Sequence, residues 1–426
     1  MFKDFIIKRL QNQAKRYIAK HQPKIIAVAG SIGKTSTKIA IATVLSQRYK
    51  VRVHGGNYNV DVTVPLVVFD IDLPEKLHSP FAWFGIMIRA EAMIRRKTNL
   101  VDVIILELGT DKPGDIEEFK SWLKPDIAVI TAVAPEHMEF FKTLEAVAQE
   151  ELTIASFSNL TIINRDDISE DYAHYATTEN IDTYGLSGVA EYRFVIEDAK
   201  PGQGFSGKFV SSEFGELPMQ LHLVGEHNVK AAVAAGTIGA KLGLTSQQVT
   251  DGMQAITPVS GRMNLLRGVE RSTIIDDTYN SSPVAAIAAL QTLYMFQAPQ
   301  HIAILGSMNE LGDTSAQAHE QVGKACDPKA LDWVITVGEE AEKYLAPAAA
   351  AKGCRVQSCK TAIEAGAYVH KMMQPEAVIL AKGSQGNMYL EEAVKILLHD
   401  AEDEKKLVRQ SDLWMARKDK FFSAFK

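Results

Sequence analysis

Short apolar runs alternate with amphipathic, helix-like stretches along most of this 426-residue chain. The first part of the chain has apolar runs at 25–28, 103–108 and 126–131, and helical patterns at 38–47, about 114–122 and 228–242. Near-continuous apolar strands between helices are typical of a parallel sheet that is buried on both faces. The pattern therefore predicts an α/β fold, with a central domain over residues 25–259 that has a mostly parallel sheet.

A less regular stretch follows within that domain, and then a second alternating series. Residues 184–223 combine alternating strand patterns with glycines, which predicts an antiparallel side sheet. Further strands are expected at 273–275, 302–305, 333–337 and 377–380, with helices between them. This series predicts a smaller, Rossmann-like, doubly wound domain over residues 260–402.

Three segments fall outside this regular pattern. Residues 1–24 predict an amphipathic helix, residues 73–100 form an insertion, and residues 403–426 form a basic, aromatic tail. All three combine aromatic and basic side chains, as do segments that contact an anionic membrane or a lipid-linked substrate. The favoured alternative is that they pack on the protein, because most amphipathic helices face a core.

Composition narrows the class of protein. A net charge of −6 gives no general reason to expect nucleic-acid binding, which favours a basic face. The three cysteines have no paired spacing, so a reducing compartment, the cytoplasm, is expected. The apolar run at 81–88 is far shorter than the roughly 20 residues that span a bilayer, which predicts that the chain is not transmembrane.

The most informative motif lies between the first apolar run and the first helix. Gly30, Ser31, Gly33, Lys34, Thr35 and Ser36 belong to a G-x-x-G-K-T-S loop that follows the run 25–28. Glycines let the backbone approach an anion, and amides at a helix N-terminus point towards it. Lysine adds a charge, and the threonine hydroxyl suits Mg²⁺. The loop therefore predicts a P-loop-type nucleotide site, although the common motif has its first glycine two positions earlier.

Other polar residues follow predicted strands, where open α/β sheets bind ligands. Glu107 could hold Mg²⁺ or be a solvated strand-end carboxylate, and His137 could be a metal ligand or ordinary polar surface. Asn228 could cap a helix or contact an adenine edge. Arg262 suits phosphate, and Asp277 suits a ribose hydroxyl.

The order and wording of nine short segments resemble the Mur ligases, ATP-dependent amide-forming enzymes of peptidoglycan synthesis. These segments are G-x-x-G-K-T, GNYN, ELG, APEH, GEHN, GR, DDTYN, LGSMNELG and AKGSQG, and they cover residues from about 25 to 398. The wording is most similar to the MurF branch, which adds D-alanyl-D-alanine to a UDP-N-acetylmuramoyl tripeptide. The resemblance implies an ADP-forming carboxylate–amine ligase that works through an acyl phosphate on a peptidoglycan peptide precursor or an analogue.

The resemblance also implies ATP and Mg²⁺ as cofactors and gives roles to individual residues. Lys34, Glu107, His137 and Glu151 would be catalytic, and Thr35, Glu107, His137 and Glu151 would hold metal. Glu151 stands where family members usually carry a carbamylated lysine. The nucleotide would contact Gly30, Ser31, Gly33, Lys34, Thr35, Ser36, His227, Asn228, Arg262, Asp277 and Tyr279. The substrates, which are small molecules or peptides with a carboxylate and an amine, would contact Asn57, Asn59, Asn309, Glu310, Lys382 and Ser384.

The chain also departs from the family pattern. Members begin with a domain that grips the UDP end of the precursor, whereas about 24 residues precede the first expected strand here. Individual positions also differ from those usual in the family: Thr63, Ala132, Ser282, Ser307 and Gln385. Two alternatives therefore stay open, a ligase of the folylpolyglutamate or cyanophycin type and a non-catalytic ATP-binding regulator. Nothing in the sequence indicates an oligomeric state.

Overall fold

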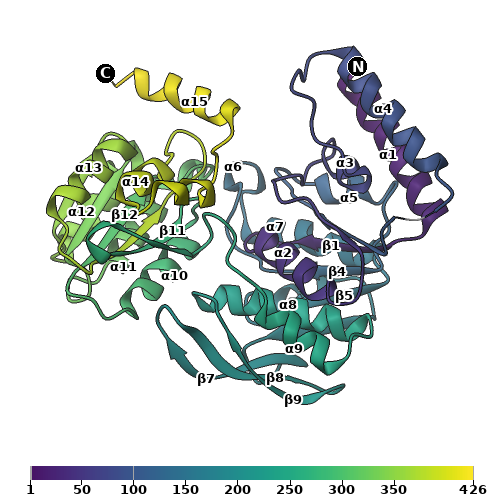
Figure 1. The fold of residues 1–426 in the computed structure, drawn as a ribbon, viewed down its shortest axis with the longest axis horizontal. Helices are drawn as coiled ribbons and strands as arrows, with labels where there is room; N and C mark the ends of the chain where they lie inside the picture. Colours follow the sequence, from purple (N-terminus) through teal and green to yellow (C-terminus); the bar gives the residue numbers. More distant parts are fainter. Residues whose placement is uncertain (1, 99, 426) are drawn as a thin grey trace.

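The computed structural model describes residues 2–98 and 100–425, which form two α/β domains and two terminal helices (Figure 1). The larger domain has one nine-stranded sheet in the order β2-β3-β1-β4-β5-β6-β7-β8-β9. Its strands are β1 (Lys24–Ala29), β2 (Val51–Arg52), β3 (Val103–Glu107), β4 (Ile127–Ile130), β5 (Leu160–Asn164), β6 (Ile181–Gly185), β7 (Tyr192–Lys200), β8 (Gly204–Ser211) and β9 (Gly215–Leu221). The parallel, doubly covered sheet predicted from the apolar runs is confirmed.

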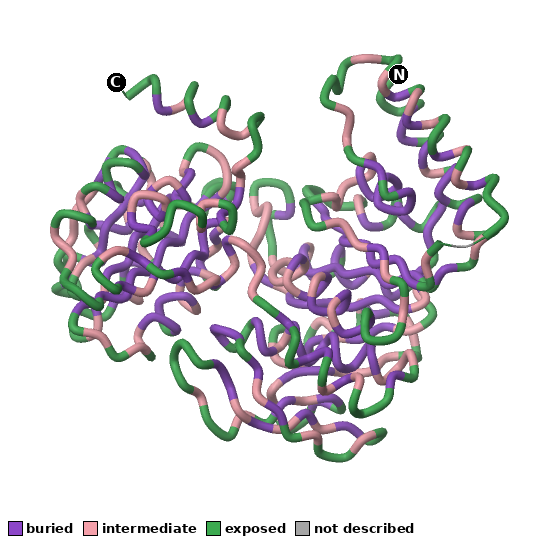
Figure 2. The backbone as a smooth tube through the Cα atoms, in the orientation of Figure 1, coloured by how far each residue is buried: buried purple, intermediate pink, exposed green. Residues whose placement is uncertain are grey.

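Alternate residues of β1 face the two layers of helices. Ile25, Ala27 and Ala29 pack with one apolar core, and Ile26 and Val28 pack with the other. The first layer includes α3 (Val64–Phe69), α5 (Asp115–Phe119) and α7 (Leu144–Leu152), and the second includes α2 (Lys34–Leu45), α8 (Glu226–Lys241) and α9 (Ser246–Gln254). The short helix α6 (Met138–Phe141) precedes α7. Figure 2 shows the resulting belt of buried backbone through the strands.

The expected antiparallel part is present, but it is not a separate sheet. Strands β7, β8 and β9 pair antiparallel with one another, while β7 pairs parallel with β6 and so extends the main sheet. Gly204 has φ 103°, and a Cβ there would lie 2.0 Å from the carbonyl oxygen of Leu221. The glycine therefore permits the close approach of the β8 start to β9.

The smaller domain has a six-stranded sheet in the order β10-β11-β15-β12-β13-β14, in which only the β10–β11 pair is antiparallel. Its strands are β10 (Asn264–Arg267), β11 (Thr273–Asp277), β12 (His301–Gly306), β13 (Trp333–Val337), β14 (Val356–Cys359) and β15 (Val378–Lys382). One core includes α10 (Pro283–Tyr294), α11 (Ser315–Ala325) and α12 (Ala346–Ala351), and the other α13 (Ala362–Met372) and α14 (Glu391–Leu397). The predicted doubly wound arrangement is confirmed.

The N-terminal segment and the insertion form one unit. Helix α1 (Phe2–His21) lies beside α4 (Pro80–Arg95), and the two project from the larger domain (Figure 1). Their facing sides are buried, with Leu10 and Tyr17 of α1 and Trp83 and Ile86 of α4 in the core. One face of each of these two helices therefore packs on the protein, as the favoured interpretation predicts.

The C-terminal tail also packs on its neighbouring domain. It contains a short 3₁₀ helix, η6 (Ala401–Lys406), and α15 (Asp412–Ser423). Lys418 is buried and pairs with Glu391 at 2.9 Å and Glu392 at 2.6 Å, and the ring of Phe421 meets that of Tyr389 edge-on. The expected boundary at 402/403 falls inside η6.

The described residues include no helix that is both long and apolar enough to cross a membrane. All three cysteines, Cys326, Cys354 and Cys359, are buried free thiols.

Candidate active site

A cavity of about 380 Å³ lies between the two domains. The larger domain lines it with residues 31–35, with Glu107 at the end of β3, and with His137 in the loop that follows β4. The smaller domain lines it with Arg262, Tyr279 and Asn309. Because the carboxyl ends of the parallel strands in both domains face this space, it has the position in which open α/β sheets bind ligands.

The loop that enters this cavity has its glycines where the backbone requires them. Gly30 has φ 119° and Gly33 has φ 87°, both in the left-handed region. A Cβ on Gly30 would lie 2.3 Å from the Thr131 hydroxyl oxygen, and the next amide, of Ser31, donates to Ala132 at 2.9 Å. The loop thus folds tightly over the end of β4 and delivers the N-terminus of α2 to the cavity. Amides in a first helical turn have no partner within the helix and suit an anion.

Lys34 is the first residue of α2 and is largely buried. Its ammonium group donates to the carbonyl of Gly30, and it lies 3.7 Å from a carboxylate oxygen of Glu136 and 4.0 Å from one of Glu151. Burial lowers the pKa of Lys34, but Glu136, Glu151 and Glu107 outweigh burial, so the pKa lies above its usual value. The side chain is therefore a fixed positive charge at the phosphate-binding loop.

Glu151 lies behind the loop, at the end of α7, and is fully buried. Its Oε2 accepts a hydrogen bond of 2.6 Å from the amide of Gly30, while its Oε1 has no hydrogen-bond partner. Burial raises the pKa of the neighbouring Glu136 well above its usual value; Lys34 opposes this shift and Glu151 adds to it. The Glu136 carboxyl therefore holds its proton more tightly than an exposed glutamate does.

Glu107, at the end of β3, meets α2 from the other side. The Thr35 hydroxyl donates to its Oε2 at 3.1 Å, and Lys38 pairs with the same oxygen at 2.8 Å. Lys38 also donates to the carbonyl of Gly56 at 3.1 Å. A hydroxyl and a carboxylate oxygen on the cavity wall are the hard ligands that Mg²⁺ prefers, so Thr35 and Glu107 fit a magnesium site.

His137 begins α6 in a left-handed conformation, with φ 46°. Its Nε2 lies 3.7 Å from Asp111, and its Nδ1 lies 3.4 Å from Glu310 of the smaller domain. Over residues 2–98 and 100–425, no group of three or more His, Cys, Asp or Glu side chains is arranged to hold a metal ion. The structure therefore does not bring Glu107, His137 and Glu151 together as one metal site, although His137 remains beside the cavity.

Arg262 faces the loop from the smaller domain. Its guanidinium carbon lies 4.2 Å from the centre of the Tyr279 ring, and its Nε is buried without a hydrogen-bond partner. A buried donor without a partner is costly, and arginine presents its donors in a fork that matches phosphate. The cavity thus has an unsatisfied cationic donor on one wall and a phosphate-type loop on the other.

Several expected nucleotide contacts are placed elsewhere. Asp277 and Lys382 are buried and paired at 2.6 Å, and the amide of Asn228 donates to Val224 at 2.9 Å. Burial lowers the pKa of Lys382, and Asp277 opposes that shift. The cavity wall, taken over the described chain, does not include Gly30, Ser36, His227, Asn228, Asp277, Lys382 or Ser384. In this structure the side-chain amide of Asn228 is therefore engaged by the backbone just before its own helix, and its contact with adenine stays a prediction.

The expected substrate residues divide in the same way. Asn57, Asn59, Asn309 and Glu310 line the cavity. Ser384 instead accepts a hydrogen bond of 2.9 Å from the backbone amide of Asn309, and so shapes the loop that carries it.

Three supporting residues were missed by the sequence analysis. Lys38 is one helical turn after Lys34, a spacing that places both on one face of α2, so it could have been found. Glu136 belongs to the APEH segment, but no role for its side chain was predicted from the sequence. Arg409 had no local signal: it pairs with Glu391 at 2.7 Å and donates to the carbonyls of Thr278 at 2.6 Å and Tyr279 at 3.0 Å. The tail thereby supports the strand-end loop that carries Tyr279.

The fold and the cavity define a two-domain nucleotide-binding protein whose site is completed by both domains. Comparison with known proteins then identifies the family. The model of the Mur ligase middle domain matches residues 28–239, and that of the Mur ligase glutamate ligase domain matches residues 261–385. The chain belongs to the Mur ligase family.

Individual relatives point to one branch of this family. The chain is 28% identical over 341 residues to the UDP-N-acetylmuramoyl-tripeptide–D-alanyl-D-alanine ligase of Bacillus subtilis, covering 79% of this chain and 67% of that protein. The enzyme of the same name from Escherichia coli is 26% identical, over 88% of this chain and 76% of its own length.

Solved structures show the same fold. MurF from Acinetobacter baumannii matches with a TM-score of 0.76 and 23% identity, over 92% of this chain and 80% of its own. The folylpolyglutamate synthase of Mycobacterium tuberculosis matches less closely, with a TM-score of 0.63 and 17% identity, over 90% and 94% of the two chains.

Proposed function

We propose that this chain is an ATP-dependent, ADP-forming ligase that joins a carboxylate to an amine, with a peptidoglycan peptide precursor or a close analogue as substrate. The observation that carries the proposal is that both domains present cationic groups to one cavity. Lys34 and the N-terminus of α2 lie on one wall, and Arg262, whose Nε has no hydrogen-bond partner, lies on the other. The names of the curated relatives support the MurF-type reaction, and no feature of the cavity favours the folylpolyglutamate, cyanophycin or regulatory alternatives.

The residues present fit the proposed chemistry. Lys34 and the amides at the start of α2 would hold the phosphates of ATP, and Arg262 would contact them from the other domain. Thr35 and Glu107 would hold Mg²⁺, which when bound neutralises charge on the phosphates. His137 stays a candidate ligand for a second ion, while the position of Glu151 favours support of the loop.

Two bond-forming steps follow from this arrangement. A carboxylate oxygen of the first substrate attacks the γ-phosphorus, the bond to ADP breaks, and an acyl phosphate forms. The amine then attacks the acyl carbon, phosphate leaves, and the amine loses a proton. Neither step needs a covalent bond to the protein, so catalysis depends on orientation and on charge stabilisation by Lys34 and Arg262.

The amine-binding side is proposed to lie at the smaller domain, where Asn309 and Glu310 line the cavity. The buried free thiols support a reducing compartment, and we propose the cytoplasm. Contact with a membrane or a lipid-linked substrate stays a prediction.

The test is an assay with ATP, Mg²⁺, UDP-N-acetylmuramoyl tripeptide and D-alanyl-D-alanine, followed by mass spectrometry of the product. ADP release that requires both the carboxylate and the amine is expected, and Lys34→Ala should lower turnover by about 10³-fold or more. Other acid and amine pairs form the second arm of the screen. Tight ATP binding without product from any pair would support a regulatory protein instead.

A further inference from the structure

The projecting helix pair carries an apolar surface at its free end. Six large apolar side chains are exposed there, and we call them the apolar tip: Phe2, Phe5, Leu77, Phe81, Phe84 and Ile88. Phe81 is the most open of them, with 87% of its surface exposed. Clustered exposed apolar side chains on a folded protein mark an interaction site more often than isolated ones do.

Contacts between the helices place these residues at the same end. Gln13 donates to the carbonyl of Met87 at 2.9 Å, and Lys20 donates to that of Ile94 at 2.8 Å, so α1 and α4 run parallel with a constant offset. This register sets Phe2 and Phe5 level with the residues just before and at the start of α4. The apolar tip therefore draws on both helices and on the loop that precedes α4.

The tip is a second apolar surface, distinct from the one that packs on the protein. Phe81, Phe84 and Ile88 follow one another at spacings of three and four, which places them on one face of α4. Trp83 and Ile86 lie between them in the sequence and are buried in the core. Helix α4 is thus apolar on two faces, and helix α1 packs against the buried one.

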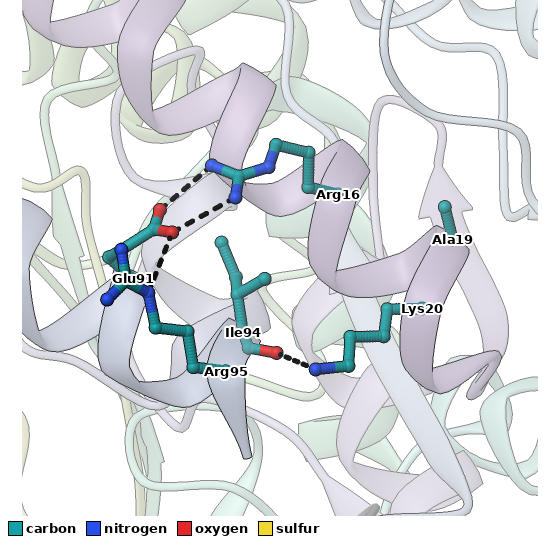
Figure 3. Close-up of a pocket in the computed structure, with 6 residues that line it drawn as sticks. All are labelled: Arg16, Ala19, Lys20, Glu91, Ile94 and Arg95. Carbon is teal, nitrogen blue, oxygen red and sulfur yellow. Dashed lines mark hydrogen bonds and ion pairs between the residues drawn. The ribbon is translucent and has the colours of Figure 1, made fainter. Parts of the chain in front are cut away.

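Polar contacts link the two helices below this surface. Figure 3 shows Glu91 of α4 held by both Arg16 and Arg95, with distances of 2.8 Å and 3.0 Å between its two oxygens and the Arg16 guanidinium nitrogens. The same view shows Lys20 reaching the carbonyl of Ile94. These contacts fix α1 against α4 over the lower part of the pair.

Charge indicates the kind of surface that fits the tip. Helices α1 and α4 together contain eight Lys and Arg residues against two acidic ones, in a chain whose net charge is −6. Lys3, Lys8, Arg9 and Arg89 are all exposed and close in sequence to the tip phenylalanines. A second copy of this chain would bring two such basic rims together, which like-charge repulsion opposes.

We propose that the apolar tip docks on an anionic lipid surface, with the phenyl rings among the acyl chains and the basic residues at the headgroups. Exposed aromatic side chains beside Lys and Arg are the composition of segments that bind such surfaces. Helix α15 lies on the same edge of the molecule as the helix pair (Figure 1), and its Leu413 and the following Phe425 are exposed.

Vesicle flotation of the full chain tests this proposal. Vesicles of phosphatidylcholine with phosphatidylglycerol are expected to bind the protein, and vesicles of phosphatidylcholine alone are expected to bind it much less. The double substitution Phe81→Ser, Phe84→Ser should weaken binding by about tenfold or more. The double substitution Lys8→Glu, Arg9→Glu should weaken vesicle binding by about fivefold or more for each basic residue that is lost. Binding of the unchanged chain should also fall strongly as the salt concentration rises.

Val189→Ser is the matched control, because Val189 is an exposed apolar residue of the larger domain outside the tip. It should bind vesicles as the unchanged chain does. All the variants should retain ADP release with soluble substrates, since none of these residues lines the interdomain cavity. Loss of vesicle binding therefore remains separate from failure of the proposed ligase reaction.

Three results would overturn the proposal. The first is equal flotation with and without phosphatidylglycerol, and the second is equal flotation of the double Phe variant. The third is a dimer, seen by light scattering, that the double Phe substitution converts to monomer while vesicle binding is absent, which would show that the tip binds protein instead. A Phe81→Trp probe adds a direct readout, because its emission should shift to the blue only with anionic vesicles.

Discussion

Glu151 accepts a 2.6 Å hydrogen bond from the backbone amide of Gly30, and so a buried carboxylate supports the phosphate-binding loop from behind. Its second oxygen faces Lys34 at 4.0 Å. In this position the carboxylate fixes the backbone of the loop and lies beside the ammonium group of the lysine. We propose a positioning role for Glu151, because the carboxylate does not line the interdomain cavity.

Substitution of Glu151 tests this role. Glu151→Ala leaves the Gly30 amide buried without an acceptor and opens a void, which should destabilise the larger domain by about 2–3 kcal/mol in urea unfolding. Glu151→Gln keeps an acceptor and should cost less. Gln149→Ala, an exposed change on the same helix, is the control. Since Glu151 is already a carboxylate, added bicarbonate should leave turnover unchanged, and stimulation would contradict this account.

Arg262 should govern affinity for ATP. Arg262→Ala removes the unpartnered donor on the cavity wall and should raise the KM for ATP by about 10- to 100-fold, the effect of one charge-assisted hydrogen bond. Arg267→Ala, an exposed change on β10, should leave KM unchanged. An unaltered KM in Arg262→Ala would remove this arginine from the nucleotide site.

Arg409 should matter for both stability and nucleotide binding. Its loss would leave Glu391 with one fewer cationic partner and free the carbonyls of Thr278 and Tyr279, which should destabilise the smaller domain by about 3 kcal/mol. Because Tyr279 supports Arg262, the KM for ATP should rise as well. Lys420→Ala, an exposed tail substitution, is the control for thermal unfolding and kinetics. A normal KM would limit Arg409 to a structural role.

Asp276 should make the stability of the smaller domain depend on pH. Its buried carboxyl accepts hydrogen bonds from Gly261 and Thr278, yet burial raises its pKa to about 6, from 3.8. A folded pKa above the unfolded one means that the folded state holds the proton more tightly. This contribution is therefore complete below pH ~4 and is lost as the pH rises through about 6.

Urea unfolding at two pH values measures this effect. Between pH ~7.5 and pH ~5 the wild-type free energy of unfolding should gain about 1.4 kcal/mol from this group. Asp276→Asn should lack that gain while it responds equally to the other titrating groups. Parallel pH profiles for the two proteins would show that Asp276 keeps an ordinary pKa.

The fold was predictable because its signals are local. Apolar runs such as 25–28 and 103–108 are buried on both faces wherever they occur in a parallel sheet, and the spacing of Gly30 and Gly33 depends only on the turn that they make. The helices were predictable from the amphipathic spacing of their apolar residues. The joining of β7 to β6 was missed because strand pairing depends on the rest of the domain.

The site was predictable only in part, because partners distant in the sequence decide which groups face the cavity. Asp277 and Lys382 are 105 positions apart in the sequence, and their side chains form a buried ion pair. Glu151 is 121 positions from Gly30, and Arg409 is 130 from Tyr279. No local sequence pattern predicts contacts between residues so far apart. Family resemblance found the cavity residues Lys34, Glu107, His137 and Arg262, but it did not show the supporting network.

The central claim is that ATP phosphorylates a substrate carboxylate in the interdomain cavity. The most direct measurement uses a tripeptide precursor whose terminal carboxylate is labelled with ¹⁸O, together with ATP, Mg²⁺ and the amine. The account predicts that each phosphate released with product carries one ¹⁸O atom from the carboxylate, and that Lys34→Ala releases none. Amide product accompanied by unlabelled phosphate would contradict the acyl phosphate and, with it, the proposed reaction.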